Sequence, residues 1–198
     1  GTKNFSIKYT SQPRDLAGLR IYTDADYAGD LADRKSTTGV LAQWCGQPVH
    51  WRSTKQNCVA TSTTEAEYIA AATGYKEAQW LRQILAQLLE PQGVKLDPTP
   101  VHIDNQSAIA LGQSTAIHNR SKHIDVRYHS IRDGVAHKEI TLVDTPTEKQ
   151  LADLFTKPLA KDVHQHLCKV IDGRKDTDAA LGRTTEDNTK DDEPLHQD

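Results

Sequence analysis

A chain of 198 residues is long enough for one domain with a full hydrophobic core and too short for two large ones. Hydrophobic residues make up 36% and charged residues 26%, and no apolar run approaches the about twenty residues of a membrane helix, so we expect a soluble protein without a membrane span. No signal peptide is evident. The cysteines, Cys45, Cys58 and Cys168, are too widely spaced for a zinc site or a disulfide framework, which favours an intracellular setting.

The net charge of -3 is unevenly distributed along the chain. Residues 1–160 hold 18 basic and 17 acidic side chains, whereas residues 161–198 hold 6 and 10. A segment with so few large apolar side chains buries too little surface to offset its ordering entropy. We therefore expect a disordered acidic tail at 172–198, preceded at 161–171 by a short extension for which a helix is one option. The absence of methionine, even at position 1, indicates a piece of a longer polypeptide.

Three short strands open the predicted domain. The first is expected at 19–25, and two more at 40–44 and 48–52 are separated by a loop of hairpin length that contains Gly46. From 64 to 90, apolar residues recur at helical spacing until Pro91 and Gly93 end the helix. The first half thus predicts an antiparallel sheet followed by a long helix.

Helices and strands alternate in the second half. A buried strand at 100–104 feeds a helix at 105–111, and a helix at 121–137 and a strand at 139–144 follow. A last helix is expected to open at Pro146, because Thr147-x-x-Gln150 matches a capping box. The order β-β-β-α-β-α-α-β-α predicts an α/β fold in which helices lie on the faces of a mixed sheet.

Four acidic residues recur at the ends of strands or in the first turns of helices: Asp24, Glu67, Asp104 and Asp153. Each has an ordinary explanation, since Asp is a favoured helix N-cap and acids are favoured near helix N-termini. Asp24 and Asp26 share strand parity, so periodicity does not choose between them. Carboxylates that converge in space repel one another unless cations neutralise them, so the joint pattern indicates a divalent-metal site for phosphate chemistry.

The helix near Thr64 contains two glutamates on different faces. Glu65 shares the polar face, which predicts exposure to solvent, whereas Glu67 lies on the alanine-rich stripe that faces the sheet. Ser62-x-x-Glu65 matches a capping box, although Thr64-x-x-Glu67 has the same spacing. A sheet-facing carboxylate is costly unless it binds something, so Glu67 is the better functional candidate.

Six ordered sequence blocks run through residues 1–160: YTDADYAGD from Tyr22, GQPVHWRSTKQ from Gly46, TSTTEAEYIAA from Thr61, HIDNQSAIAL from His102, RSKHIDVRYHSIRD from Arg120 and TPTEKQLADLFTKPL from Thr145. Together they resemble the ribonuclease H domain of a copia-type retrotransposon Pol polyprotein, a far more specific signal than one short motif. Residues 1–18 resemble the segment that connects the reverse transcriptase to this domain. The resemblance therefore implies a ribonuclease H domain at 19–160.

This resemblance implies a ribonuclease H-like fold with a five-stranded mixed sheet and helices on both faces. It also implies a catalytic set that holds two Mg²⁺ ions, with Mn²⁺ as a substitute and without an organic cofactor: Asp24, Glu67, Asp104 and Asp153. The family pattern selects Asp24 over Asp26 and Glu67 over Glu65. Asp24 would bridge the ions, Glu67 and Asp104 would hold the ion on the leaving-group side, and Asp153 the ion that activates water.

The implied activity is endonucleolytic cleavage of the RNA strand of RNA·DNA hybrids during reverse transcription. A hybrid is recognised by its A-like shape and 2′-hydroxyls, for which the polar candidates are Ser53, Lys55, Gln56, Asn57, Thr61, Ser62, Thr63 and Asn105. The candidates for following the phosphates are Arg120, Lys122, His123 and Arg127. Solvated loops and a solvated helix face explain both groups about equally well.

The implied partner is the reverse transcriptase domain of the same polyprotein, in the cytoplasm within virus-like particles, with the nucleus as a further option. Residues 143–148 lack the histidine that cellular ribonucleases H carry before the last catalytic aspartate, which puts the turnover rate in question. One alternative is a catalytically inactive, fossil domain that binds hybrids or supports the reverse transcriptase, which the intact acidic set disfavours. Another is an integrase-like nuclease, a class that usually relies on three acids.

Overall fold

The computed structural model describes residues 7, 9, 18–114 and 122–171, with side chains in the last range from His129 onward. The predicted tail at 172–198 and most of the connecting segment at 1–18 lie outside these residues. None of the three cysteines forms a disulfide. Among the described helices, none has both the length and the apolar character needed to cross a bilayer.

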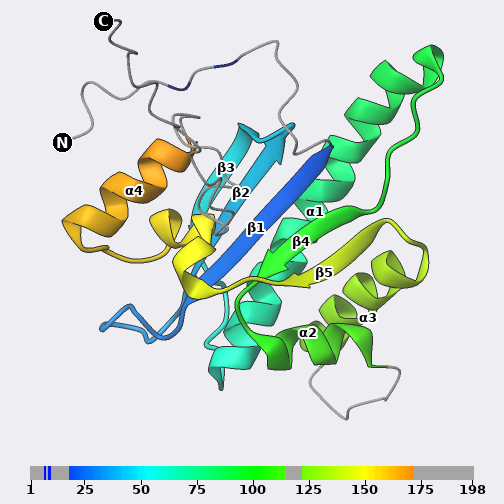
Figure 1. Ribbon diagram of the computed structural model, residues 1–198. Coiled ribbons are helices and arrows are strands. Elements are labelled where there is room, and N and C mark those ends of the chain that lie inside the picture. The colour runs from blue at the N-terminus through cyan, green and yellow to red at the C-terminus, as the bar shows by residue number, and fades with distance from the viewer. Residues whose placement is uncertain (1–6, 8, 10–17, 115–121, 172–198) are drawn as a thin grey trace, which may run out of the picture.

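Five strands of the described chain form one mixed sheet with the order β3-β2-β1-β4-β5 (Figure 1). Strands β1, β2 and β3 pair antiparallel, and β4 and β5 join β1 in parallel. Their bounds are Leu19–Asp26 for β1, Thr37–Trp44 for β2, Gln47–Lys55 for β3, Thr99–Ile103 for β4 and Ile140–Asp144 for β5. The predicted ribonuclease H-like sheet is confirmed, and β2 and β3 exceed their predicted lengths because Thr37 pairs with Lys55.

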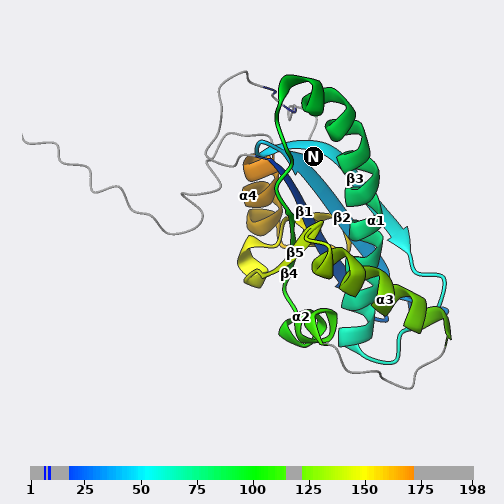
Figure 2. The same cartoon turned by 90° about the vertical axis from the view of Figure 1, so that its right-hand side faces the viewer.

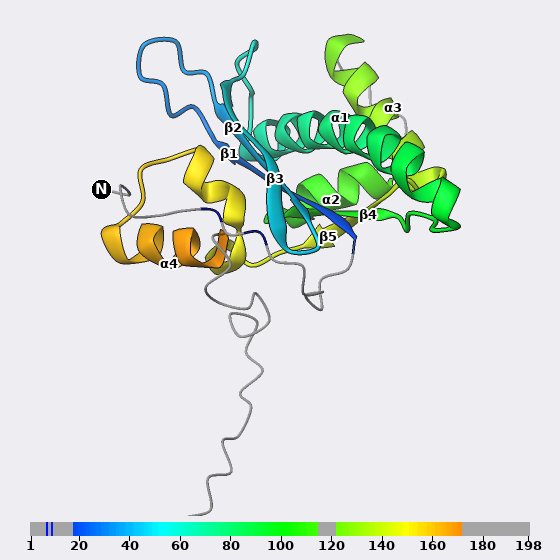
Figure 3. The same ribbon diagram turned by 90° about the horizontal axis from the view of Figure 1, so that it is seen from above.

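Helices cover both faces of the sheet, as predicted. In Figures 2 and 3, α1 and α3 lie on one side of the sheet and α4 lies on the other. The α-helices are α1 at Thr63–Leu89, α2 at Gln106–Gln113, α3 at Lys122–Ala136 and α4 at Lys161–Ile171, and short 3-10 helices are η1 at Glu90–Gln92, η2 at Thr147–Lys149 and η3 at Leu151–Phe155. The extension at 161–171 is thus a helix, whereas the domain boundary at 160 remains a prediction.

Two apolar clusters pack on opposite faces of the sheet because successive strand residues point to opposite sides. Ile21 of β1 lies in the cluster beneath α1, together with residues of α2 and α3. Its neighbour Tyr22 lies in the second cluster, with Leu41 of β2, Leu151 of η3 and Leu167 of α4. The second cluster anchors η3 against the sheet, and η3 carries Asp153.

The predicted α-helix from Pro146 is wrong, and so is its capping box. Residues 147–149 and 151–155 form two 3-10 helices, and Pro146, the N-cap of the first, makes no side-chain cap. Gln150 interrupts them with an extended backbone, and its fully buried side chain donates to the carbonyl oxygens of Thr23 and His102. The long-range bonds of Gln150 therefore prevail over the local helical signal.

Candidate metal centre

Asp24 lies near the end of β1 and is 2% exposed. Thr156, just after η3, donates a hydrogen bond from its hydroxyl to Oδ2 of Asp24. The ammonium nitrogen of Lys157 lies 3.8 Å from the same oxygen. A buried carboxylate is tolerated only with such partners. Thr156 and Lys157, which directly follow η3, therefore stabilise the carboxylate of Asp24.

Glu67 lies in the first turns of α1 and faces the sheet, as predicted. Its Oε1 accepts a hydrogen bond of 3.1 Å from the backbone N–H of Ala25 in β1. Its Oε2 is buried and has no hydrogen-bond partner. An orphaned carboxylate oxygen in the interior is an observation that favours a bound cation.

The predicted exposure of Glu65 is wrong, because its side chain is only 5% exposed. Its carboxylate accepts hydrogen bonds from the backbone N–H and the hydroxyl of Thr61, at 2.7 and 2.5 Å. Ser62 is the N-cap of α1, with its side chain accepting a hydrogen bond from the N–H of Glu65, as the capping box predicted. The loop before α1 folds over the first turn and buries Glu65, so Glu65 has a structural role.

Asp104 directly follows β4, and its Oδ2 lies 3.4 Å from the hydroxyl of Thr147, which donates to it. The N-cap of the following helix is Asn105, whose Oδ1 accepts from the N–H of Ala108 at 2.9 Å. The ordinary explanation for an aspartate at this place, helix capping, therefore belongs to the neighbouring residue. The carboxylate of Asp104 is left available to a ligand.

The structure brings Asp24, Glu67 and Asp104 together, with one carboxylate oxygen from each lying within 4.8 Å of the others. Burial and the charges of Asp24 and Asp104 raise the pKa of Glu67 to about 9. Burial and the charge of Asp24 also raise the pKa of Asp104. Three carboxylates on two adjacent strand ends and one helix start thus form a site where ionisation is unfavourable without a cation.

Asp153 lies beside this cluster rather than within it. It is 5% exposed in η3, its Oδ1 is buried without a partner, and its Oδ2 lies 3.1 Å from the ammonium nitrogen of Lys157. Burial, followed by the charge of Asp24, raises the pKa of Asp153 to about 7. Because Lys157 contacts both Asp153 and Asp24, it links the fourth acid to the other three.

The known proteins similar to this chain include transposon polyproteins. The chain is 44% identical over 155 residues to the retrovirus-related Pol polyprotein from transposon TNT 1-94 of Nicotiana tabacum, covering 78% of this chain and 11% of the relative. It is 39% identical over 172 residues to the one from transposon RE1 of Arabidopsis thaliana, covering 86% and 11%. Its homologues are copia-type transposon Pol polyproteins. The chain spans about a tenth of the length of these relatives, and no family model matches it.

Among solved structures, the chain is similar to LC11-RNase H1 in complex with an RNA/DNA hybrid, with a TM-score of 0.49 and 17% sequence identity over 70% of this chain and 93% of that one. The five-stranded mixed sheet and its strand order, described above, are those of the expected ribonuclease H-like fold.

Three residues that contact the acids or the backbone beside them escaped the sequence reasoning: Gln150, Thr156 and Lys157. All three lie in the block from Thr145. Lys157 follows Asp153 by four residues, a spacing typical of ion pairs, so this signal could have found it. The partners of Gln150 and Thr156 lie 127 and 132 residues away, and no local pattern indicates them.

The polar candidates for hybrid contacts differ in exposure along the end of β3 and the loop that follows it. Ser53 and Asn57 are exposed, and Lys55 is exposed but forms ion pairs with Asp30 and Asp33. Gln56 does not join this exposed group: it is 5% exposed, and its amide nitrogen donates to Thr38 and to the carbonyl of Ala66.

Four of the remaining candidates lie at helix starts. Thr61, Ser62 and Thr63 are exposed at the N-terminus of α1, where Thr61 and Ser62 take part in its cap. Asn105 caps α2. Arg120 lies outside the described residues, and Lys122, His123 and Arg127 lie in α3 with side chains outside the description.

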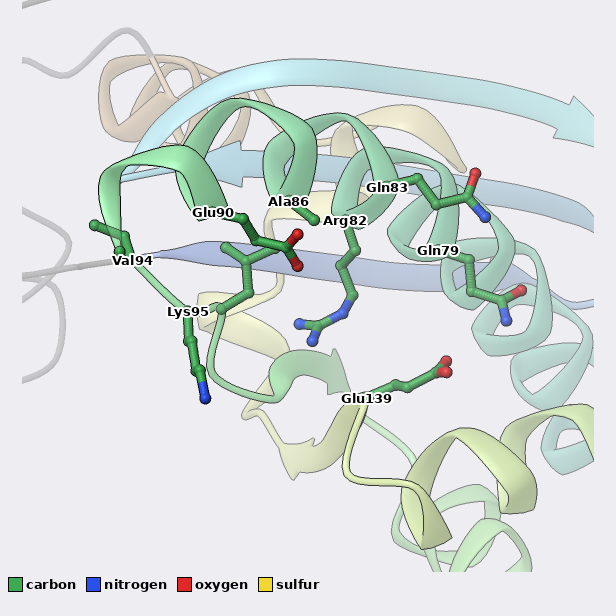
Figure 4. A pocket seen from close by; sticks show the side chains of 10 residues that line it. Gln79, Arg82, Gln83, Ala86, Glu90, Val94, Lys95 and Glu139 are labelled. Atoms are coloured by element: carbon green, nitrogen blue, oxygen red, sulfur yellow. The ribbon is translucent and has the colours of Figure 1, made fainter.

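A pocket of about 610 Å³ lies at the C-terminal end of α1 (Figure 4). The second half of α1, the segment before β4 and Glu139 line it. The guanidinium of Arg82 donates to the carbonyl of Asp97 and to the hydroxyl of Thr99, at 2.6 and 2.9 Å. Arg82 therefore ties this segment to α1, and the acidic cluster lies at the opposite end of the helix, where α1 begins.

Proposed function

We propose that this chain cleaves the RNA strand of RNA·DNA hybrids endonucleolytically, by a mechanism that uses two divalent cations, during reverse transcription of a retrotransposon. The observation that carries this proposal is the buried group of Asp24, Glu67 and Asp104, with carboxylate oxygens within 4.8 Å of one another. The homology to transposon Pol polyproteins supports it, because these relatives are named for the polyprotein that contains a polymerase.

The donor set fits Mg²⁺, with Mn²⁺ as a substitute. All four acids offer carboxylate oxygens, the ligand type that Mg²⁺ prefers, and no cysteine or histidine belongs to the group found among the described residues. Orphaned buried oxygens of Glu67 and Asp153 are available as ligands. Bound divalent ions would supply an activated water and stabilise the leaving oxygen.

The protein's own contribution is to hold these ligands in place before the substrate arrives. The N–H of Ala25 orients Glu67, and the hydroxyl of Thr156 orients Asp24. When ions are bound, Asp24 would be a ligand of both, Glu67 and Asp104 would hold the one that stabilises the leaving oxygen, and Asp153 would hold the one that activates water. Ligands held in advance lose little freedom on binding, which makes the site effective for catalysis.

The hybrid is proposed to lie across the start of α1, next to the acids. Thr61, Ser62 and Thr63 are exposed there, two turns or less from Glu67. Ser53 is exposed near the end of β3, and Asn57 is exposed on the loop that leads from β3 to α1. Hydroxyl and amide groups suit 2′-hydroxyls and phosphate oxygens. Lys55, Asn105, Arg120, Lys122, His123 and Arg127 remain further candidates, and the proposed partner is the reverse transcriptase domain in cytoplasmic virus-like particles.

The test is cleavage of a labelled RNA·DNA hybrid with Mg²⁺ or Mn²⁺. Asp24→Asn and Asp104→Asn should abolish cleavage and leave the circular dichroism spectrum unchanged. Asp26→Asn is the matched control, because Asp26 ends the same strand outside the acidic group and should retain activity. A folded wild-type chain without activity would instead support the inactive hybrid-binding domain, and DNA strand transfer would support an integrase-like enzyme.

A further inference from the structure

The buried amide of Gln150 joins the three elements that carry Asp24, Asp104 and Asp153. Its nitrogen donates to the carbonyl oxygens of Thr23 in β1 and His102 in β4, at 3.0 and 3.3 Å. Its oxygen accepts a hydrogen bond from the N–H of Ala152 in η3, at 3.3 Å. Thr23 and Ala152 directly precede Asp24 and Asp153, and His102 lies two residues before Asp104. One side chain thus contacts the backbone beside three of the four acids.

Gln150 lies where the two central parallel strands stop pairing. The ladder between β1 and β4 consists of Ile21 with Val101 and Tyr22 with His102, and it ends before the acids. Buried backbone carbonyls beyond a ladder need other donors. The amide of Gln150 donates to the carbonyls of Thr23 and His102, and the hydroxyl of Thr23 adds a longer bond of 3.5 Å to the carbonyl of His102. The side chain of Gln150 is 0% exposed, so no solvent is available to replace it. The side chain extends the link between the strands toward the acidic cluster.

The geometry points to a positioning role: we propose that Gln150 sets the separation of Asp24, Asp104 and Asp153 and thereby the affinity of the acidic site for divalent cations. This inference rests on the proposed function. Carboxylates of like charge repel one another, so strand ends that carry them spread unless something holds them. β2 and β5 continue to pair along the outer sides of β1 and β4, but between β1 and β4 themselves no ladder continues beyond Tyr22 and His102 to resist this repulsion. Partners behind metal ligands commonly control metal affinity in this way.

At this position a glutamine side chain can form all three hydrogen bonds, because its amide donates two and accepts one. Methionine has a similar length and fills the volume but donates nothing. Ionised glutamate has the same shape, accepts hydrogen bonds only, and would face two carbonyl oxygens that are themselves acceptors. Gln150→Met and Gln150→Glu therefore remove the bridge while keeping the packing volume nearly constant.

The experiment is calorimetric titration of the metal-free protein with Mg²⁺, together with cleavage at increasing Mg²⁺. Gln150→Met should bind Mg²⁺ about 10- to 100-fold more weakly, a range typical of lost partners behind metal ligands. Cleavage should recover at high Mg²⁺, because the ligands themselves remain. Wild-type Mg²⁺ affinity in a folded Gln150→Met or Gln150→Glu variant would overturn the proposal.

Two control variants separate positioning from simple loss of stability. Gln43→Met makes the same change at another fully buried glutamine, on β2, whose amide has no partner. Tyr75→Phe removes the hydrogen bond of 2.6 Å from Tyr75 to Glu139, which lies next to the start of β5, away from the acids. Both should keep wild-type Mg²⁺ affinity, including when Tyr75→Phe unfolds at a lower temperature. Equal weakening in all variants would overturn a specific role for Gln150.

A measurement on the wild-type protein covers the case in which the variants do not fold. The side-chain amide protons of Gln150 should exchange slowly with solvent in nuclear magnetic resonance spectra, and their resonances should shift when Mg²⁺ is added. Rapid exchange would overturn the proposed bridge. A wild-type protein that binds no divalent cation would overturn the proposed function itself, and this outcome is visible in the first titration, before any variant is compared.

Discussion

The ammonium nitrogen of Lys157 lies 3.1 Å from Oδ2 of Asp153, four residues earlier in the chain. The same nitrogen lies 3.8 Å from Oδ2 of Asp24 on β1. Burial by itself would lower the pKa of Lys157, but the carboxylates of Asp24 and Asp153 outweigh it and raise the pKa. Lys157 is therefore charged at neutral pH and provides a positive charge within the acidic site.

Lys157→Met should destabilise the metal-free protein and increase its affinity for divalent cations. Without the ammonium group, Asp24 and Asp153 lose a neutralising partner, and a competitor of the cation is removed. Because Lys157 is partly exposed, we expect the free energy of unfolding to fall by about 1 kcal/mol, a value between those of surface and buried ion pairs. Thermal unfolding with a chelator and calorimetric titration with Mg²⁺ measure the two effects.

Lys161→Met is the control for this prediction, because Lys161 is exposed at the start of α4 and forms none of the ion pairs found around the acids. It should change neither quantity. Equal behaviour of the two variants would mean that Lys157 does not neutralise the site.

The metal-free protein should lose stability as the pH rises because of Glu67. The pKa of Glu67 is raised from 4.5 in the unfolded chain to about 9 by burial and by Asp24 and Asp104. Between these values the folded state binds a proton that the unfolded chain has lost. The resulting stabilisation is complete below pH 4.5 and disappears as the pH rises toward 9. Asp153, with its pKa raised to about 7, acts in the same direction.

Glu67→Gln tests this pH dependence, because the neutral amide needs no proton. Its free energy of unfolding in a chelator should exceed that of the wild type by an amount that grows with pH, and added Mg²⁺ should stabilise only the wild type. Glu65→Gln is the matched control on the same helix: it weakens two hydrogen bonds from Thr61 and should be less stable than the wild type. A constant difference between Glu67→Gln and the wild type would contradict the prediction.

Ending the chain at Ala160, the sequence-predicted boundary, should destabilise the domain. Leu167 and Val170 of α4 are each 2% exposed and pack in the cluster with Tyr22, Leu41 and Leu151. Because the truncation removes two buried side chains and exposes their partners, it should lower the free energy of unfolding by about 3–5 kcal/mol. Urea unfolding of chains that end at Ala160 and at Ile171 measures the difference. Equal stability would support the boundary at 160.

The sequence predicts well where local geometry decides the outcome. The helical period places Glu67 toward the sheet, and the turn signals around Gly46 place the hairpin between β2 and β3. The same period misplaces Glu65, because a periodic pattern describes an isolated helix and the loop before α1 then covers its first turn. Recognition of the ordered motifs, rather than periodicity, distinguishes Asp24 from Asp26.

Long-range contacts explain the elements that the sequence does not predict. A capping-box pattern at Thr147 and Gln150 indicates an α-helix, yet Gln150 bonds to β1 and β4, 127 and 48 residues away. The two 3-10 helices form because this side chain holds the backbone extended between them. The contact of Thr156 with Asp24, 132 residues away, was equally hidden, whereas the four-residue spacing from Asp153 could have indicated Lys157.

Gly39→Ala should disturb the acidic site through close packing of η3 on β2. Gly39 pairs with Asp24, and a Cβ there would lie 2.7 Å from the carbonyl oxygen of Ala152 and 2.7 Å from the methyl carbon of Thr156. Backbone atoms do not yield easily, so η3 must move, and Asp153 moves with it. We expect the free energy of unfolding to fall by about 1–3 kcal/mol. We also expect half-maximal cleavage of a hybrid to require a higher Mg²⁺ concentration.

Gly112→Ala provides the matched control for Gly39→Ala, because it overpacks α2 on the opposite face of the sheet. Its Cβ would lie 2.5 Å from the Cδ1 atom of Leu142, the end of a side chain that can turn away. Gly112→Ala should lower the unfolding temperature while the Mg²⁺ dependence of cleavage stays that of the wild type. Since both variants add one methyl group to a close contact, a raised Mg²⁺ requirement in both would show that general strain, rather than the position of η3, controls the site.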